Sequence, residues 1–148
     1  MPSLWDPNAA DHLLARFDRL TPDAPARWGR FTAPDMVAHL NESIRMCLGE
    51  ITPRTKNLPI RFFPLKQLII YVFPMPRGAP TAPELLVRSG TAVWADEVKT
   101  FRELMARLST RSSDTTWPAH PAFGPMNRRS WGVLGYKHFS HHLTQFGV

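Results

Sequence analysis

Hydrophobic residues recur at intervals of three and four in four separate stretches of this chain, the pattern of helices with one buried face. The first stretch follows Asp6-Pro7, a capping residue and a proline suited to the first helical position. The second begins at the threonine cap of Thr32-Ala33-Pro34-Asp35 and ends before Gly49. The sequence therefore predicts two N-terminal helices, over about residues 7–20 and 33–48.

The other two stretches lie in the C-terminal half of the chain. One predicts a helix that ends near Ser109, because large apolar residues alternate at spacings of four and three at Trp94, Val98, Phe101, Met105 and Leu108. Asn127 is a suitable cap for a last helix that runs to about Gln145. Between the two halves, prolines leave room only for a short helix near residues 61–72, and PMPRGAPTAPEL (74–85) is expected to be a long, mostly extended connection.

No strand-like alternation competes with these segments, so the predicted fold class is all-α. At 148 residues the chain is expected to form one domain over residues 1–148. Four amphipathic helices favour an up-and-down bundle. The gap of roughly 40 residues between the second and third helices is too long for a tight turn and calls for one crossover connection.

The charge and cysteine content narrow the range of partners. Eighteen Lys and Arg against twelve Asp and Glu give a net charge of +6, but the basic residues are scattered without a basic run, so nucleic acid is not expected as a partner. Cys47 is the single cysteine, which excludes an intramolecular disulfide and favours a reducing compartment, the cytoplasm. The longest apolar stretch, residues 60–73, falls short of the roughly 20 residues of a membrane-spanning helix, so no membrane partner is expected.

The candidate chemistry lies in the histidines of KHFSHHLTQF, residues 137–146. On a helix, His138 and His142 lie one turn apart on the flank of the apolar stripe, and His141 is turned roughly 80° away from their midpoint. The arc of His141 is polar, and its other members are Lys137, Ser140 and Thr144. We read His141 as solvent-facing. The pair alone is a weak signal, because core-edge imidazoles are often satisfied by backbone or water.

His39 strengthens the signal, because it borders the apolar stripe of the second predicted helix. One His from that helix and an i, i+4 pair from the last can converge, and helical bundles build metal sites in this way. Three imidazoles form a divalent-metal set with an open position. His12 lacks a partner at ligand spacing, His120 lies between Ala119 and Pro121 in a loop, and Cys47 lies on an apolar stripe; none of them is expected to be a ligand.

Three stretches resemble one known superfamily: MVAHL at residues 36–40, PMPRGAPTAPEL, and HPAFGPMNRRSWGVLGYKHFSHHLTQFG at residues 120–147. They are similar to the DinB/YfiT-like metal-binding four-helix bundles, in a branch of uncharacterised bacterial proteins. The resemblance implies an up-down-down-up bundle with the Pro-rich crossover between helices two and three. Members of the superfamily are commonly homodimers, so the resemblance also implies a homodimer. It further implies a metal site that maps onto His39, His138 and His142. Some members are thiol-dependent S-transferases or isomerases, and others have no established activity.

The expectation for function follows from site and resemblance together. It is a divalent-metal protein, with Zn or Ni as the metal, that acts as a thiol transferase or hydrolase on a small-molecule substrate with a low-molecular-weight thiol as cofactor. The alternative is a non-catalytic metal-binding or stress-response scaffold. Gln145, the last residue of an HHxxQ pattern, either bonds near the site or braces the helix end, and Glu42 is either an outer partner of His39 or an exposed glutamate. Sequence identifies no catalytic base.

Overall fold

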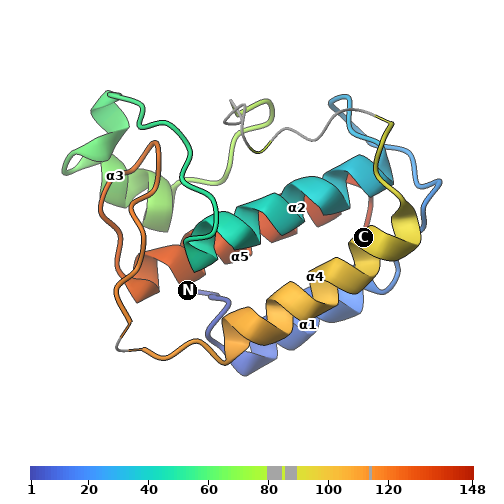
Figure 1. Ribbon diagram of the computed structural model, residues 1–148. Helices are drawn as coiled ribbons and strands as arrows, with labels where there is room; N and C mark the ends of the chain where they lie inside the picture. The colour runs from blue at the N-terminus through green and yellow to red at the C-terminus, as the bar shows by residue number, and fades with distance from the viewer. Residues whose placement is uncertain (80–84, 86–89, 114) are drawn as a thin grey trace.

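The computed structural model describes residues 1–79, 85, 90–113 and 115–148, and regular structure in that part of the chain is helical (Figure 1). The elements are α1 (Pro7–Phe17), α2 (Ala33–Leu48), the 3-10 turn η1 (Pro59–Arg61), α3 (Leu65–Gln67), the π-helical turn η2 (Leu68–Val72), α4 (Trp94–Ser109) and α5 (Arg128–Gln145). An isolated β-bridge joins His120 to Gly124, and the described residues contain no β-strand. The predicted all-α class is confirmed.

The helix starts predicted from capping residues are confirmed. The side chain of Asp6 accepts from the backbone N–H of Asn8, that of Thr32 from Asp35, and that of Asn127 from Ser130. These bonds satisfy N–H groups that have no partner within the first turn of a helix.

The predicted end of the first helix is wrong by about one turn. The helix stops at Phe17, because the N–H of Leu20 bonds to the carbonyl of Phe17 in a tighter turn before Thr21-Pro22. Leu20 is nevertheless buried, so its place in the hydrophobic pattern reflects the core and not the helix.

The middle of the chain agrees in part with its prediction. The short helix predicted near residues 61–72 is found as α3 and η2, which together cover residues 65–72 and begin directly after Pro64. Of the predicted extended connection, residues 80–84 lie outside the described residues. Residues 74–79 are not helical and turn at Gly78, whose φ is +74°. No helix in the described part of the chain combines the length and the apolar character needed to cross a membrane.

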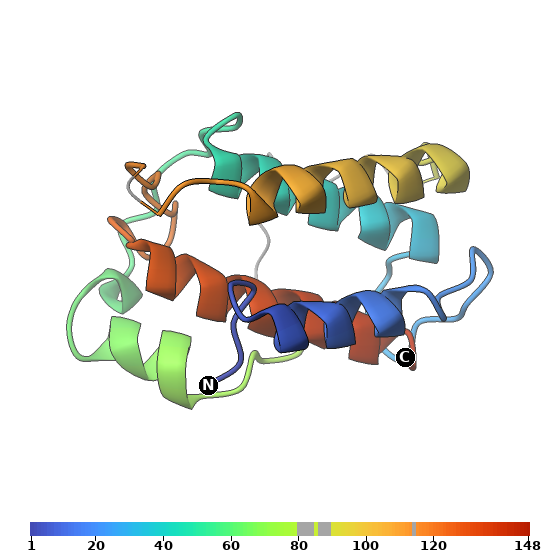
Figure 2. The ribbon, with the colours of Figure 1, turned by 90° about the horizontal axis from the view of Figure 1, so that it is seen from below.

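The long helices pack in pairs around one hydrophobic core. Figures 1 and 2 show α4 running along α2 and α1 running along α5, and α2 also touches α5. Phe101 of α4 stacks on Phe17 of α1, with ring centroids 4.1 Å apart, and lies 5.9 Å from Phe139 of α5. These rings join three helices behind the face of α5 that carries the histidines.

Polar contacts hold the side of α5 that faces away from this core. Arg16 of α1 donates to Oγ of Ser140 at 2.7 Å and to Oγ1 of Thr144 at 2.8 Å. Lys137 donates to the carbonyl of Ile69 in η2 at 2.7 Å. The polar side chains beside His141 are therefore largely engaged by neighbouring elements. Contacts with α1, α2 and η2 fix the position of α5 and of its histidines.

Candidate metal centre

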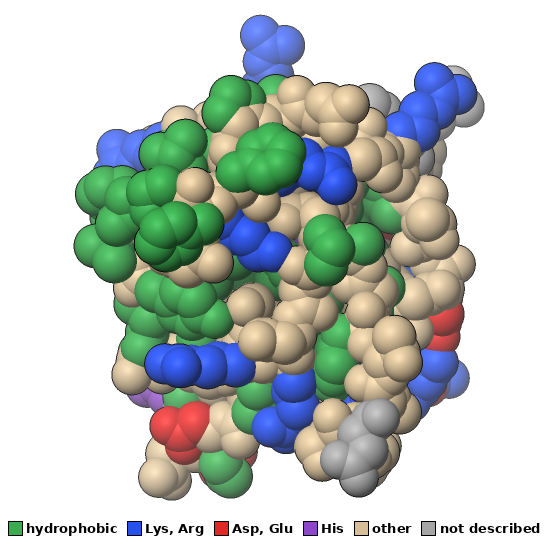
Figure 3. Space-filling model, turned by 90° about the vertical axis from the view of Figure 1, so that its left-hand side faces the viewer, with side chains coloured by type: hydrophobic (Ala, Val, Ile, Leu, Met, Phe, Trp, Pro, Cys, Tyr) green, Lys and Arg blue, Asp and Glu red, His purple; other side chains and the backbone are tan. Residues whose placement is uncertain are grey.

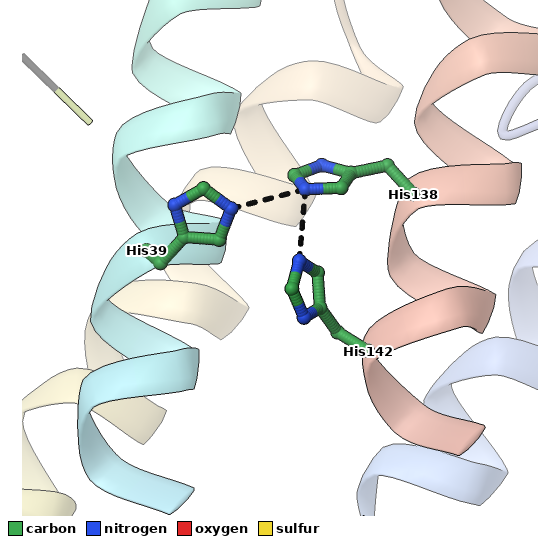
Figure 4. A group of neighbouring side chains, drawn as sticks. All are labelled: His39, His138 and His142. Atoms are coloured by element: carbon green, nitrogen blue, oxygen red, sulfur yellow. Dashed lines mark hydrogen bonds between the residues drawn. The ribbon is translucent and has the colours of Figure 1, made fainter. Parts of the chain in front are cut away.

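Three histidines from two helices meet at one point between α2 and α5 (Figure 4). Nε2 of His138 lies 3.0 Å from Nε2 of His39 and 3.1 Å from Nε2 of His142. One ligand atom from each residue lies within 4.8 Å of the others. The side chains of His39 and His142 are buried, at 2 % and 8 % exposure, and His138 is partly buried. The structure thus brings together the three residues that the sequence selected.

The outer nitrogens of two rings are bonded to oxygen atoms. Nδ1 of His39 lies 3.0 Å from the carbonyl oxygen of Leu85, and Nδ1 of His142 lies 2.8 Å from Oε1 of Gln145. Because a carbonyl oxygen can only accept, both Nδ1 atoms carry the proton. The amide of Gln145 is oriented in turn, because its Nε2 donates to the carbonyl of Trp28 at 2.7 Å.

These bonds leave Nε2 of His39 and of His142 as bare lone pairs that point at Nε2 of His138. A neutral His138 has at most one N–H there, and that N–H can satisfy one of the two acceptors at a time. A cation at the common point would accept all three lone pairs at once. Fixing the tautomer through an outer oxygen acceptor is the usual arrangement around metal-bound histidine.

Electrostatics keep the rings neutral and able to donate electron pairs. Burial, followed by the charge of His39, lowers the pKa of His142 to about 3, although its hydrogen bond with Gln145 acts in the opposite direction. Burial also lowers the pKa of His39. For His138, burial and then the neighbouring His142 and His39 lower the pKa well below its ordinary value. Near neutral pH the cluster therefore has the protonation state that a metal requires.

Two of the three nitrogen–nitrogen distances, those from Nε2 of His138, fit a first-row divalent ion. Two nitrogens bound at roughly 2.0–2.1 Å lie roughly 3.3–3.4 Å apart in a tetrahedral site and roughly 2.8–3.0 Å apart at right angles. The observed 3.0 and 3.1 Å lie between these values. The three histidines could therefore hold a divalent metal ion, and these distances do not identify which one.

Comparison with known proteins places the chain in a family. The model of a family described as "Protein of unknown function (DUF1569)" matches residues 6–147. The chain belongs to the DUF1569 family. No curated protein and no solved structure matches it. All three histidines of the cluster lie within the matched part of this DUF1569 protein.

Aromatic rings pack against the cluster in the DUF1569 chain. Phe31 stacks on His39 with centroids 5.3 Å apart and lies 5.8 Å from the ring of His142. His141 is half-buried and packs edge-on against Trp28 at 5.5 Å, so the prediction that it faces solvent is wrong. The helical wheel missed this contact because Trp28 lies in a loop that comes from outside the helix.

Gln145 contacts the cluster, whereas Glu42 does not bond to it. Gln145 is 4 % exposed and contacts both the site and the loop, so it bonds to the site and braces the helix end at the same time. Glu42 instead forms a salt bridge with Arg45 along α2. The acceptor for Nδ1 of His39 is the backbone carbonyl of Leu85, an atom that no side-chain pattern reveals.

Gly29 allows Gln145 to take its position. Its φ is +78°, a conformation that side chains rarely adopt, and a Cβ there would lie only 2.7 Å from Nε2 of Gln145. The loop residue next to Trp28 therefore has two reasons to be glycine.

The residues that sequence set aside lie apart from the cluster. His12 is exposed on α1. Burial raises the pKa of the Cys47 thiol to about 12, so this cysteine stays a protonated, apolar member of the core. Nδ1 of His120 accepts from the backbone N–H groups of Ala122 and Phe123, at 3.1 and 3.3 Å.

Proposed function

We propose that this DUF1569 protein is a divalent-metal enzyme of DinB/YfiT-like architecture, with His39, His138 and His142 as the metal ligands. The observation that carries the proposal is the convergence of three imidazoles on one point. Nε2 of His39 and Nε2 of His142 both need a hydrogen-bond donor there, and His138 can supply at most one N–H. The up-down-down-up bundle with its crossover is part of the proposal. It is supported by the paired packing of α1, α2, α4 and α5 and by a ligand set divided between α2 and α5.

An open coordination position favours catalysis over a purely structural role. In the described part of the chain the cluster contains three ligand residues and no Cys, Asp or Glu as a fourth. Structural zinc sites are usually closed by four protein ligands, whereas catalytic sites keep a position free. A divalent ion held here would supply Lewis acidity, which makes a thiol or a water more acidic near neutral pH.

The protein's own residues would prepare the site for that chemistry. The carbonyl of Leu85 and Oε1 of Gln145 hold Nδ1–H of their histidines and so present Nε2 as a lone pair. Phe31 covers the rings of His39 and His142 and limits the access of water from its side. Burial keeps the imidazoles neutral, so that protons compete little with a metal.

The reaction class that we propose is transfer of a low-molecular-weight thiol to a small electrophilic molecule, carried out in the cytoplasm by a homodimer. The net charge of +6 supports recruitment of an acidic thiol. The alternative is a non-catalytic scaffold in which the ion fastens α2 to α5. It is supported by the division of the ligands between these helices and by the deep burial of His39 and His142.

Elemental analysis of protein purified without a histidine tag tests the metal site. We expect near-stoichiometric zinc or nickel in the wild type and loss of the metal in His39→Ala. His12→Ala is the matched control, because it removes an exposed histidine from α1 and should keep the full metal content. Equal metal in all three proteins, or none in any of them, would remove the site.

Cobalt substitution separates catalysis from scaffolding. If a coordination position is open to a thiol, the visible spectrum of the cobalt protein should change when glutathione, mycothiol or bacillithiol is added. A spectrum that no thiol or water analogue changes would show a closed site and favour the scaffold. The same titration on His39→Ala controls for cobalt bound elsewhere.

A further inference from the structure

The unit formed by η1, α3 and η2 exposes an unusual amount of hydrophobic surface. Of the eight large hydrophobic side chains exposed among the described residues, six lie within residues 58–73. They are Leu58, Phe62, Phe63, Leu65, Val72 and Phe73, at 41, 68, 81, 42, 63 and 50 % exposure. We call these six side chains the α3 surface. Hydrophobic groups gathered in this way usually mark a contact site, whereas single exposed ones need no explanation.

The opposite side of the same unit is fixed to the body of the protein. Ile70 is fully buried in the core, and the hydroxyl of Tyr71 lies 2.8 Å from Oγ of Ser130 on α5. Lys137 donates to the carbonyls of Ile69 and Ile70 within η2. The unit is therefore anchored from within, and Phe62 and Phe63 are held on its outer side.

The charge around the α3 surface has one sign. Residues 51–73 contain four basic residues and no Asp or Glu. Neither α5 nor residues 115–127, which pack against the unit, contain an acidic residue. Arg129 of α5 is exposed and lies over the ring of Tyr71, 5.3 Å from its centroid. On the face that carries α3, hydrophobic and basic side chains are mixed, and acidic ones lie toward the lower and right-hand edges (Figure 3).

From this combination we propose that the α3 surface docks the protein onto an anionic lipid bilayer. Exposed phenylalanines can enter the headgroup region while basic residues next to them contact lipid phosphates, the two components of peripheral membrane binding. Charge complementarity selects this occupant over a second copy of the chain, because two such basic faces would repel each other. The proposal is independent of the metal site. It also modifies the sequence expectation that the protein has no membrane partner, which considered only spanning segments.

Vesicle sedimentation at low salt tests the proposal. The probes are vesicles of equal parts phosphatidylglycerol and phosphatidylcholine, with vesicles of pure phosphatidylcholine and a sample without vesicles as references. We expect the wild-type protein to sediment only when the anionic vesicles are present. Raised salt should release the protein from these vesicles, because salt screens the charge attraction. Phe62→Ser/Phe63→Ser should lower the partition coefficient by about tenfold or more.

Matched variants distinguish the surface from general effects. Val93→Ser removes an exposed hydrophobic side chain just before α4, far from α3 in Figure 1, and should bind as the wild type does. Arg129→Glu should weaken binding more than Lys99→Glu, which reverses an exposed charge on α4. Circular dichroism and thermal unfolding check that each variant is folded.

Three results would overturn the proposal. The first is wild-type protein that stays in the supernatant or binds both vesicle types equally. The second is a folded Phe62→Ser/Phe63→Ser variant that binds as the wild type does. The third is that this variant changes a dimer into a monomer in sedimentation velocity while neither protein binds vesicles, which would make the α3 surface a self-interface.

Discussion

His120 and the His39–His138–His142 cluster both place neutral imidazoles inside the protein, yet the two are bonded in opposite senses. At His120, Nδ1 accepts from two backbone N–H groups, and the ring packs against Phe123 and Trp131. In the cluster, Nδ1 of His39 and of His142 donates to an oxygen. At His120 the lone pair of Nδ1 is therefore satisfied by backbone donors. In the cluster the lone pairs of Nε2 of His39 and of His142 point at Nε2 of His138.

The difference separates a structural histidine from a candidate ligand better than burial does. His120, His39 and His142 all have a lowered pKa for the same main reason, desolvation. What distinguishes them is the direction of the hydrogen bond on the outer nitrogen, which decides where the remaining lone pair lies. A site search based on low pKa alone would have grouped them together.

The largest effect that tests this contrast is stabilisation by zinc. At free zinc about 1,000-fold above its dissociation constant, binding should add about 4 kcal/mol to the free energy of unfolding of the wild type. His138→Ala should lose this gain, because it removes the nitrogen that lies within 3.1 Å of both other ligands. His120→Asn should keep it. Urea unfolding of each protein with zinc or with chelator measures the gain, and an equal gain in His138→Ala would contradict the assignment.

A smaller effect is the response of His120 to acid. Burial, followed by the charge of Lys66, lowers the pKa of His120 to about 4 from an ordinary value near 6.5. Above pH 6.5 neither state binds the proton and the contribution of His120 to stability is complete. Between pH 6.5 and 4 the unfolded chain is protonated first, so stability falls as the pH falls, by about 2 kcal/mol after allowance for partial exposure.

His120→Asn isolates that loss. An asparagine oxygen can accept from the same backbone N–H groups but does not titrate. The other buried histidines remain in both proteins, so the difference in unfolding free energy between pH 7 and pH 4.5, with chelator present, reports His120. If wild type and variant lose the same stability over this range, the lowered pKa of His120 is wrong.

The smallest effect concerns the bond that orients His142. Gln145→Leu removes the acceptor of Nδ1–H and should weaken metal binding by about 10-fold, the lower end for an outer partner of a ligand. Gln145→Glu keeps an oxygen for His142 and should bind more tightly than the leucine variant. Competition with a chromophoric chelator gives the dissociation constants. Wild-type affinity in Gln145→Leu would mean that this bond does not support the site.

The elements of the fold were predictable because their causes are local. Asp6, Thr32 and Asn127 cap helices through atoms two or three residues away, so their neighbours in sequence are enough to recognise them. The end of α1 was misplaced because Leu20 continues the hydrophobic spacing while the chain has already left the helix. A residue that continues the hydrophobic spacing of a helix is usually both buried and helical, whereas Leu20 is buried but lies outside the helix.

For the candidate site, too, the features with local causes were predictable and those that depend on the folded path of the chain were not. The wheel selected His39, His138 and His142 because a position on a helix fixes a direction. One partner, Gln145, was named from the sequence with two possible roles. The main-chain carbonyl of Leu85 and the carbonyl of Trp28 that holds the amide of Gln145 were not predictable. Main-chain atoms are the same at every residue, and only the folded path shows which one arrives at a ring.

Gly29 connects the backbone of a loop to the location of a proton. Any side chain at that position would displace the amide of Gln145. If Oε1 moves out of reach of His142 in this displacement, the proton on Nδ1 can move to Nε2, the atom that faces the other two rings. His142 would then donate Nε2–H to Nε2 of His138 and could no longer offer that nitrogen to a cation, while Nε2 of His39 would still face the cluster without a donor. On the proposal that the cluster binds a metal, a substitution at Gly29 would therefore weaken that binding although Gly29 contacts Gln145 and not the histidines.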